Sequence, residues 1–252
     1  MGNLSHRFFE LLFHKENDTS NWDRNKVESW VDEQAPKLLA KEGAVLLMYG
    51  REPEKIAFLN RVKYAAWSLI SMIQNNGWKV KATEEKLNGK FANIEMKGIA
   101  DLVLERGKEL AVIDLKWRGT ARRQQIIKNE EDLQLVMYSR LLTEDDQWAH
   151  TAYFILENGK MISRNDLAFK EAIPVDPSSD HEEVNQRIYT QMEKTYQWRL
   201  QQLQSGKIEI RTKQTLDELE EYYDGEELIE LLEMRTENAV FDDYRTLINL
   251  IV

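Results

Sequence analysis

The sequence predicts an α/β domain in which helices pack on a mixed sheet of about four central strands. Apolar residues recur at helical spacing as far as residue 76, and from residue 78 they alternate as in strands. The predicted order is helix, three meandering strands, helix and strand. The 252 residues, of which 42% are hydrophobic, allow one sizeable domain or one domain with an extension.

Three helices are predicted before the first strand. Residues 4–14 place apolar side chains four apart, and residues 24–39 follow a polar loop that contains several capping residues. We expect Pro36 to kink or split this second helix. Pro53 in the first turn and Gly77 just past the end delimit a long third helix.

Strands are predicted from residue 78 onwards. Asn88-Gly89, flanked by alternating segments, is the strongest short hairpin signal in the chain. The segment Arg106-Gly107-Lys108 predicts a second turn. The alternating segments around these turns are residues 78–87, 91–96, 99–105 and 109–117.

The pattern beyond the third strand returns to helix. Residues 119–129 are expected as a loop or frayed helix, and residues 130–142 as a helix. Residues 151–156 predict a strand closed by Asn158-Gly159.

The C-terminal part has a different character. A loop at residues 166–180 leads to a mostly polar helix over roughly residues 181–205, and the remainder is acidic and helical. We therefore expect a core domain at residues 1–170 and a mostly helical acidic extension at residues 181–252, packed on or beside the core.

The net charge of −10 argues against a simple nucleic-acid binder, whose footprint should be basic. The charge is uneven, however, because much of the negative excess lies after residue 216. Between residues 116 and 128 every charged side chain is basic: Lys116, Arg118, Arg122, Arg123 and Lys128. A local basic segment of this kind is compatible with DNA binding.

Composition also narrows the cellular setting. No apolar run approaches the roughly 18 residues needed to span a bilayer. The start of the chain lacks the basic and apolar segments of a secretory signal. The chain has no cysteine, which excludes disulfides, thiolate zinc sites and iron–sulfur clusters and fits a reducing compartment. We expect a cytoplasmic protein without a membrane partner.

Two carboxylates interrupt apolar strand segments: Asp101, and Asp114 with Lys116 two residues further on. Such charges are costly unless they are paired or bind a metal. Carboxylates on neighbouring strands, about 4.8 Å apart, can share one divalent ion, for which the Leu115 carbonyl is a further candidate ligand. Asp114 and Lys116 point to one face, so the ammonium can lie over a phosphate or an attacking water. This arrangement predicts metal-dependent phosphodiester hydrolysis.

The Asp-x-Lys triplet by itself is weak evidence, because it occurs by chance on the order of once in a chain this long. The same spacing with glutamate occurs at residues 84–86 and 95–97. The combination in sequence order is more specific: Gly98-x-x-Asp101, Asp114-x-Lys116 and Gln134-x-x-x-Tyr138.

Together with Gly2-Asn-Leu-Ser-His6, these motifs resemble the PD-(D/E)xK nuclease superfamily, specifically its RecB-type exonuclease branch. That branch carries Gly-x-x-x-His, Gly-x-x-Asp, Asp-x-Lys and Gln-x-x-x-Tyr in this order. The resemblance covers residues 2–156 and implies a restriction-endonuclease-like core. It further implies that Mg²⁺ or Mn²⁺ is bound by His6, Asp101, Asp114 and the Leu115 carbonyl. Lys116 would act on the attacking water and stabilise the transition state.

The resemblance also implies a substrate and partners. Gln134 and Tyr138 would position the site or the DNA, and Arg122 and Arg123 would contact phosphates. Glu85 is the candidate for a glutamate that relatives often carry on the first strand.

The implied activity is hydrolysis of DNA, most readily from an end, in repair or recombination. Relatives are frequently the nuclease part of a helicase-like protein, so a helicase subunit or domain is an expected partner. Some relatives hold an iron–sulfur cluster, for which this chain lacks the ligands.

Each motif residue also has a purely structural interpretation. His6 can be a polar residue on an amphipathic helix, the two aspartates can be turn residues, and Gln134 with Tyr138 is an ordinary helical pair. Two other functions stay open at this point. One is a catalytically silent DNA-end-binding or scaffold module of a helicase–nuclease complex, and the other is a protein-interaction domain.

Overall fold

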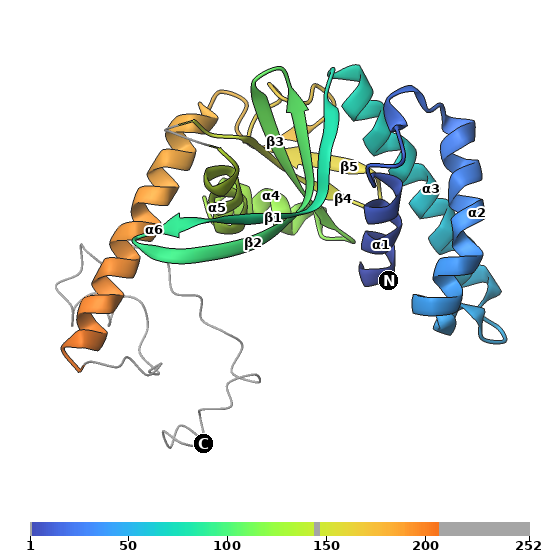
Figure 1. Ribbon diagram of the computed structural model, residues 1–252, viewed down its shortest axis with the longest axis horizontal. Helices are drawn as coiled ribbons and strands as arrows, with labels where there is room; N and C mark the ends of the chain where they lie inside the picture. Colours follow the sequence, from blue (N-terminus) through green and yellow to red (C-terminus); the bar gives the residue numbers. More distant parts are fainter. Residues whose placement is uncertain (1, 144–146, 207–252) are drawn as a thin grey trace. The chain divides into compact units, whose positions relative to one another are not determined.

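The computed structural model describes residues 2–143 and 147–206 (Figure 1). Residue contacts divide the chain into two compact units, Met1–Gln186 and Arg187–Val252, and each is described by itself. The acidic helical segment predicted near the C-terminus lies outside the described residues. In the second unit, the described part is the continuation of helix α6 (His181–Gln204).

One six-stranded mixed sheet forms the centre of the first unit, with strand order β1-β2-β3-β4-β5-β6 (Figure 1). The pairs β1–β2, β2–β3 and β4–β5 are antiparallel, whereas β3–β4 and β5–β6 are parallel. Two helices lie between β3 and β4 and form the crossover that joins these parallel strands. The strands are Lys79–Phe91, Ile94–Arg106, Glu109–Lys116, His150–Ile155, Lys160–Ser163 and Ile173–Pro174. The predicted α/β fold with a mixed sheet is confirmed.

Three helices precede the sheet, as predicted. Pro36 does not split the second helix, since it lies inside one continuous element. The Asp23 side chain caps this helix by accepting a hydrogen bond of 2.8 Å from the Lys26 N–H. The three are α1 (Gly2–Leu12), α2 (Arg24–Glu42) and α3 (Glu52–Asn75), with short 3₁₀ turns η1 (Thr19–Asn21) and η2 (Ala44–Leu47).

The sheet is covered on both faces because side chains of successive strand residues point to opposite sides. Leu102, Ile113 and Phe154 pack with the buried residues of α1, α2 and α3. Val103 and Val112 face the other way and pack with α4 (Thr120–Lys128) and α5 (Leu133–Leu142). The predicted loop or frayed helix after β3 is therefore the short helix α4.

The first hairpin turns at a different place from the one predicted. Asn88 and Gly89 lie inside the ladder, opposite Lys97 and Met96, and the turn is Ala92-Asn93 with φ values of 47° and 67°. The Asn-Gly prediction was wrong because a local turn signal was overridden by pairing along two long strands. Of the predicted segments 91–96 and 99–105, residues 94–96 and 99–105 consequently belong to one strand, β2, while residue 91 ends β1.

A buried ion pair fixes the start of α5, which carries two of the motif residues. Arg164 Nη2 donates to both carboxylate oxygens of Asp132, at 2.8 and 2.9 Å, and both side chains are buried. Arg164 Nη1 also donates to the Ile127 carbonyl at 3.2 Å, so one guanidinium joins the end of α4 to the N-cap of α5.

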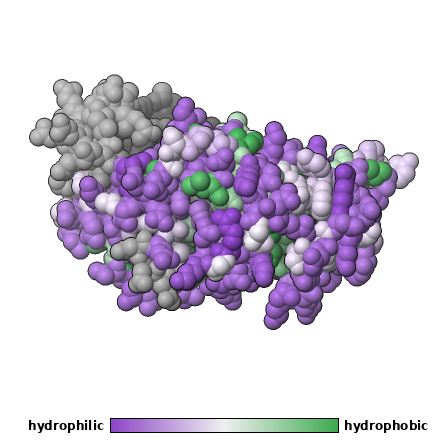
Figure 2. All heavy atoms as spheres, turned by 90° about the horizontal axis from the view of Figure 1, so that it is seen from above, coloured by the Kyte–Doolittle hydropathy of each residue, from purple (hydrophilic) through white to green (hydrophobic). Residues whose placement is uncertain are grey.

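The surface seen in Figure 2 is predominantly hydrophilic, and apolar side chains appear there only in small separate patches. Within the part of the chain that the structure describes, no helix combines the length and the hydropathy needed to cross a membrane.

Two stacked imidazoles make the fold sensitive to acid. His150 and His181 stack with ring centroids 4.4 Å apart, and His150 Nε2 lies 3.5 Å from Glu109 Oε1. Burial lowers the pKa of His150 to about 4, with His181 adding to the effect and Glu109 opposing it. An unfolded imidazole binds its proton near pH 6.5, whereas folded His150 stays neutral down to about pH 4.

We therefore expect the free energy of unfolding to fall as the pH drops from 6.5 to 4, by up to about 1.4 kcal/mol per pH unit for this imidazole. Urea denaturation at several pH values measures the slope. His150→Gln should flatten it, whereas His14→Gln, at a histidine whose side chain is 45% exposed, should not. Equal slopes for wild type and His150→Gln would contradict this assignment.

Candidate metal centre

The candidate site forms where strands β2 and β3 separate. Their ladder runs from Arg106↔Glu109 to Leu102↔Ile113, and Asp101 and Asp114 are the next residues on the two strands. In place of the ladder, Asp101 Oδ2 accepts a hydrogen bond from the Leu115 N–H at 2.7 Å. This bond satisfies a backbone donor and fixes the orientation of the carboxylate.

Asp101 meets side chains from two other elements. His6 on α1, Glu84 on β1 and Asp101 on β2 each offer a ligand atom, and these atoms lie within 4.8 Å of one another. His6 Nδ1 is 3.9 Å from Asp101 Oδ2, which is too long for a hydrogen bond. The three elements thus converge on one point although they are distant in the sequence.

The glutamate in this cluster is Glu84, whereas the sequence favoured Glu85. The pairing of β1 with β2 shifts by one residue between Val80 and Ala82, and Glu84 itself has a φ of 49°. A bulge of this kind redirects side chains, so simple alternation assigns the wrong neighbour. Glu85 lies beside it and lines a separate groove along β1. No sequence signal identified Glu84 as a site residue.

The chemistry of the cluster fits a divalent cation. Donors bound to one ion at about 2.0–2.6 Å lie no more than about 5 Å apart, which the 4.8 Å spread satisfies. One imidazole and two carboxylates are ligands for Mg²⁺, Mn²⁺ and similar ions. Desolvation raises the pKa of the Glu84 carboxyl, and Asp101 and Glu10 add to that rise while His6 and Arg7 oppose it. A bound cation would relieve this crowding of carboxylates.

Asp114 and Lys116 form a second pair beside the cluster. The Asp114 side chain is 3% exposed, and Lys116 Nζ lies 2.6 Å from its Oδ2. Burial raises the pKa of the Asp114 carboxyl, and the Lys116 ammonium opposes that rise. Within the described residues, Oδ2 has no hydrogen bond of good geometry beyond this ion pair. Asp114 is not one of the three clustered residues, although a buried carboxylate oxygen of this kind suits a cation.

Gln134 and Tyr138 on α5 are linked to each other and to the Gly98 motif. Gln134 Nε2 donates to the Tyr138 hydroxyl at 3.0 Å. A Cβ atom on Gly98 would lie 2.6 Å from Tyr138 Cε1, so the tyrosine ring packs directly on the glycine backbone. The Gly-x-x-Asp and Gln-x-x-x-Tyr motifs are therefore in contact, which the sequence did not predict.

The two arginines of α4 have different surroundings. Arg122 is exposed. The Arg123 guanidinium lies over the ring of buried Tyr153, with its carbon 5.1 Å from the ring centroid. Tyr153 is paired with Asp114 across β3 and β4, and Arg123 lowers the pKa of Asp114, against the larger effect of burial. The Leu115 side chain is buried, and the contact it makes in the site is through its backbone N–H.

The mixed sheet with helices on both faces is a restriction-endonuclease-like α/β fold, and a group of residues that could hold a metal ion lies beside the point where β2 and β3 separate. The sequence matches the family model of the PD-(D/E)XK nuclease superfamily over residues 1–221, and the chain belongs to that superfamily. No curated protein matches the sequence.

The contact between Gly98 and Tyr138 can be tested by stability. We expect Gly98→Ala to lower the free energy of unfolding by about 1–3 kcal/mol, because the new methyl group overlaps an aromatic ring. Gly89→Ala is the matched control, since its Cβ would meet only the tip of the Leu141 side chain, which can rotate away. Urea denaturation compares the two, and a Gly98→Ala cost no greater than that of Gly89→Ala would contradict the close packing.

Proposed function

We propose that this protein is a divalent-metal-dependent deoxyribonuclease that degrades DNA from an end, in repair or recombination. The observation that carries the proposal is the convergence of His6, Glu84 and Asp101 from three separate elements, next to the Asp114–Lys116 pair. Membership of the nuclease superfamily supports the reaction class. The match of four motifs to the RecB-type order supports the exonuclease mode and a helicase subunit or domain as partner.

In this proposal His6, Glu84 and Asp101 hold the cation, with Asp114 and the Leu115 carbonyl as further candidate ligands. Mg²⁺ or Mn²⁺ bound there would withdraw charge from the phosphate and lower the pKa of a water. An imidazole ligand favours Mn²⁺ more than an all-oxygen site would. The hydrogen bond from the Leu115 N–H keeps the Asp101 carboxylate in one orientation before the substrate arrives.

Lys116 supplies positive charge where the reaction needs it. A water attacks the phosphorus atom and the bond to a sugar oxygen breaks, so negative charge builds up on the phosphate oxygens in the transition state. The ammonium donates hydrogen bonds to those oxygens, and Asp114 at 2.6 Å holds it in place. Gln134 and Tyr138 position the site, while Arg122 and Arg123 provide charge for the neighbouring phosphates.

Removing either member of the pair tests the catalytic proposal. We expect Asp114→Ala or Lys116→Ala to lower cleavage of linear DNA with Mn²⁺ at least 100-fold, because transition-state charge is no longer stabilised. A gel assay of labelled DNA, with EDTA as a metal-free control, measures the rate. Circular dichroism checks that each variant is folded.

The chain offers a matched control with the same spacing. Glu95 and Lys97 on β2 are exposed, and Glu95→Ala/Lys97→Ala removes the same two charge types. We expect near-normal cleavage from this variant. Near-normal cleavage by Asp114→Ala or Lys116→Ala would sink the proposed function, and DNA binding without cleavage by the wild type would favour the catalytically silent module.

The role of Glu84 is separately testable by metal binding. Glu84→Gln keeps the shape of the side chain but removes a charge, so we expect the affinity for Mn²⁺ to fall on the order of tenfold. Isothermal titration calorimetry of the protein without DNA measures this, with Glu95→Gln as the control. An unchanged Mn²⁺ affinity for Glu84→Gln would exclude Glu84 as a ligand.

A further inference from the structure

A groove runs along strand β1 on the side away from β2. Its volume is about 690 Å³, and one side of it is formed by Trp78, just before β1, and by the β1 residues Lys79 to Thr83 and Glu85. Since β1 is the edge strand of the sheet, its backbone groups on this side have no strand partner in the part of the chain that the structure describes. The groove therefore combines open backbone donors with the side chains of its rim.

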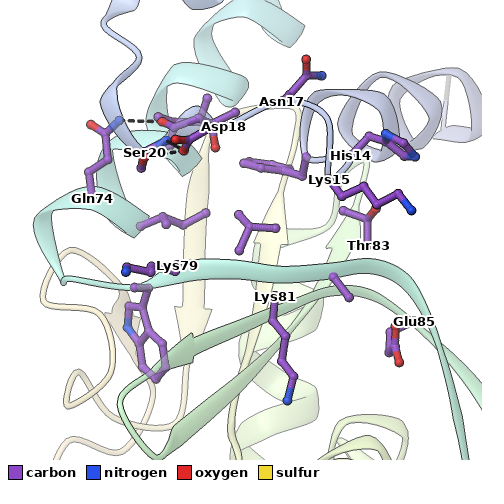
Figure 3. A pocket seen from close by; sticks show the side chains of 17 residues that line it. His14, Lys15, Asn17, Asp18, Ser20, Gln74, Lys79, Lys81, Thr83 and Glu85 are labelled. Atoms are coloured by element: carbon purple, nitrogen blue, oxygen red, sulfur yellow. Dashed lines mark hydrogen bonds between the residues drawn. The ribbon is translucent and has the colours of Figure 1, made fainter.

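The opposite side of the groove is the segment between α1 and α2, seen above β1 in Figure 3. Internal bonds hold this segment in place. Gln74 Nε2 on α3 donates to the carbonyls of Thr19 and Trp22, each at 3.0 Å, and Asp18 caps η1 by accepting from the Ser20 N–H at 3.1 Å. Because the wall is fixed by these bonds, the groove exists before any ligand binds.

The rim of the groove is more basic than the chain as a whole. The lining contains three lysines, Lys15, Lys79 and Lys81, and two carboxylates, Asp18 and Glu85, whereas the whole chain has a net charge of −10. All three lysines are exposed, and none has an ion pair within 4 Å among the described residues. His14, Asn17 and Thr83 add further polar groups to the lining. Exposed ammonium groups of this kind suit a polyanion.

One end of the groove adjoins the candidate metal centre along strand β1. Glu85 lines the groove, and Glu84, the preceding residue, belongs to the cluster with His6 and Asp101. From Glu84 to Lys79 the strand rises roughly 16 Å, at about 3.3 Å per residue. That length accommodates a few nucleotides of a DNA strand.

We propose that this groove binds a single strand of DNA continuous with the strand being cut, with its phosphates contacted by Lys15, Lys79 and Lys81. The inference rests on the proposed function and specifies its substrate as DNA with a single-stranded segment of a few nucleotides beside the scissile phosphate. One strand is favoured over a duplex because the groove, bounded by β1, by the segment between α1 and α2 and by Ile70, Ile73 and Gln74 of α3, is too small at about 690 Å³ to enclose a duplex. The aromatic residues of the lining, Phe13 and Trp78, are buried, so the contacts are with the backbone and are independent of base sequence.

Charge reversal on β1 tests the groove through DNA binding. We expect Lys79→Glu/Lys81→Glu to raise the Kd for a fluorescent dodecathymidine at least tenfold, measured by anisotropy in EDTA at low salt. The slope of log Kd against log salt should fall by about 1.4, at 0.7 for each lost phosphate contact. The matched control is Lys37→Glu/Lys90→Glu, which changes two exposed lysines outside the groove. It should shift Kd less than threefold.

A footprint on the unaltered protein keeps the test independent of how the variant folds. Acetylation of lysines, read by mass spectrometry, should be reduced at Lys15, Lys79 and Lys81 when the dodecathymidine is bound, and unchanged at Lys37 and Lys90. A dinucleotide should protect none of the three rim lysines as strongly as the longer strand does. The proposal is overturned if DNA does not reduce acetylation of the three rim lysines, or if it reduces acetylation of Lys37 and Lys90 equally.

The outcomes separate this inference from the proposed function. Cleavage by the wild type, together with a Kd for Lys79→Glu/Lys81→Glu no worse than that of the control variant, overturns the groove and leaves the nuclease. It would assign the open edge of β1 to another occupant, such as an extended peptide that adds to the sheet. Loss of binding in Lys79→Glu/Lys81→Glu, with no cleavage by the wild type under any metal, supports the groove and overturns the nuclease.

Discussion

The candidate site depends on the point where strands β2 and β3 stop pairing. Up to Leu102↔Ile113 the two strands satisfy each other's backbone groups, and one residue further the Asp101 carboxylate takes the Leu115 N–H instead. A carboxylate in an apolar strand is costly without such a partner. This bond removes that cost and holds the Asp101 carboxylate beside Glu84 of the paired strand β1 and His6 of α1.

The two aspartates at this split have different environments, which suits different roles. Asp114 is buried and ion-paired with Lys116, whereas Asp101 is half-buried and faces His6 and Glu84. The first pair holds an ammonium group at the edge of an apolar core. The second group crowds carboxylates around an imidazole, an arrangement that a divalent cation stabilises. Packing of Tyr138 on Gly98 then ties helix α5 to the strand that carries Asp101.

Net charge is a poor guide to what this protein binds, because charge acts over about 10 Å at ordinary salt. The chain is acidic overall, but the residues lining the β1 groove include three lysines and two carboxylates. The basic segment of α4 is another local departure from the average, with Arg122 exposed. A polyanion that meets the protein along β1 and at the metal centre encounters these local fields rather than the total.

The sequence by itself determined the α/β class, the long N-terminal helices and the motif residues, because helical periodicity, buried carboxylates and motif spacing are local properties of the chain. It did not determine that the hairpin turns at Ala92-Asn93 or that Glu84 belongs to the cluster. Both follow from the register of β1 on β2, because one extra residue at the bulge near Lys81 redirects the side chains after it. The motif resemblance implied that His6 and Asp101 bind one ion, but only the tertiary structure shows Glu84 beside them and the edge of β1 open as a groove. Contacts between elements dozens of residues apart are set by how helices and strands pack, and no local pattern encodes them.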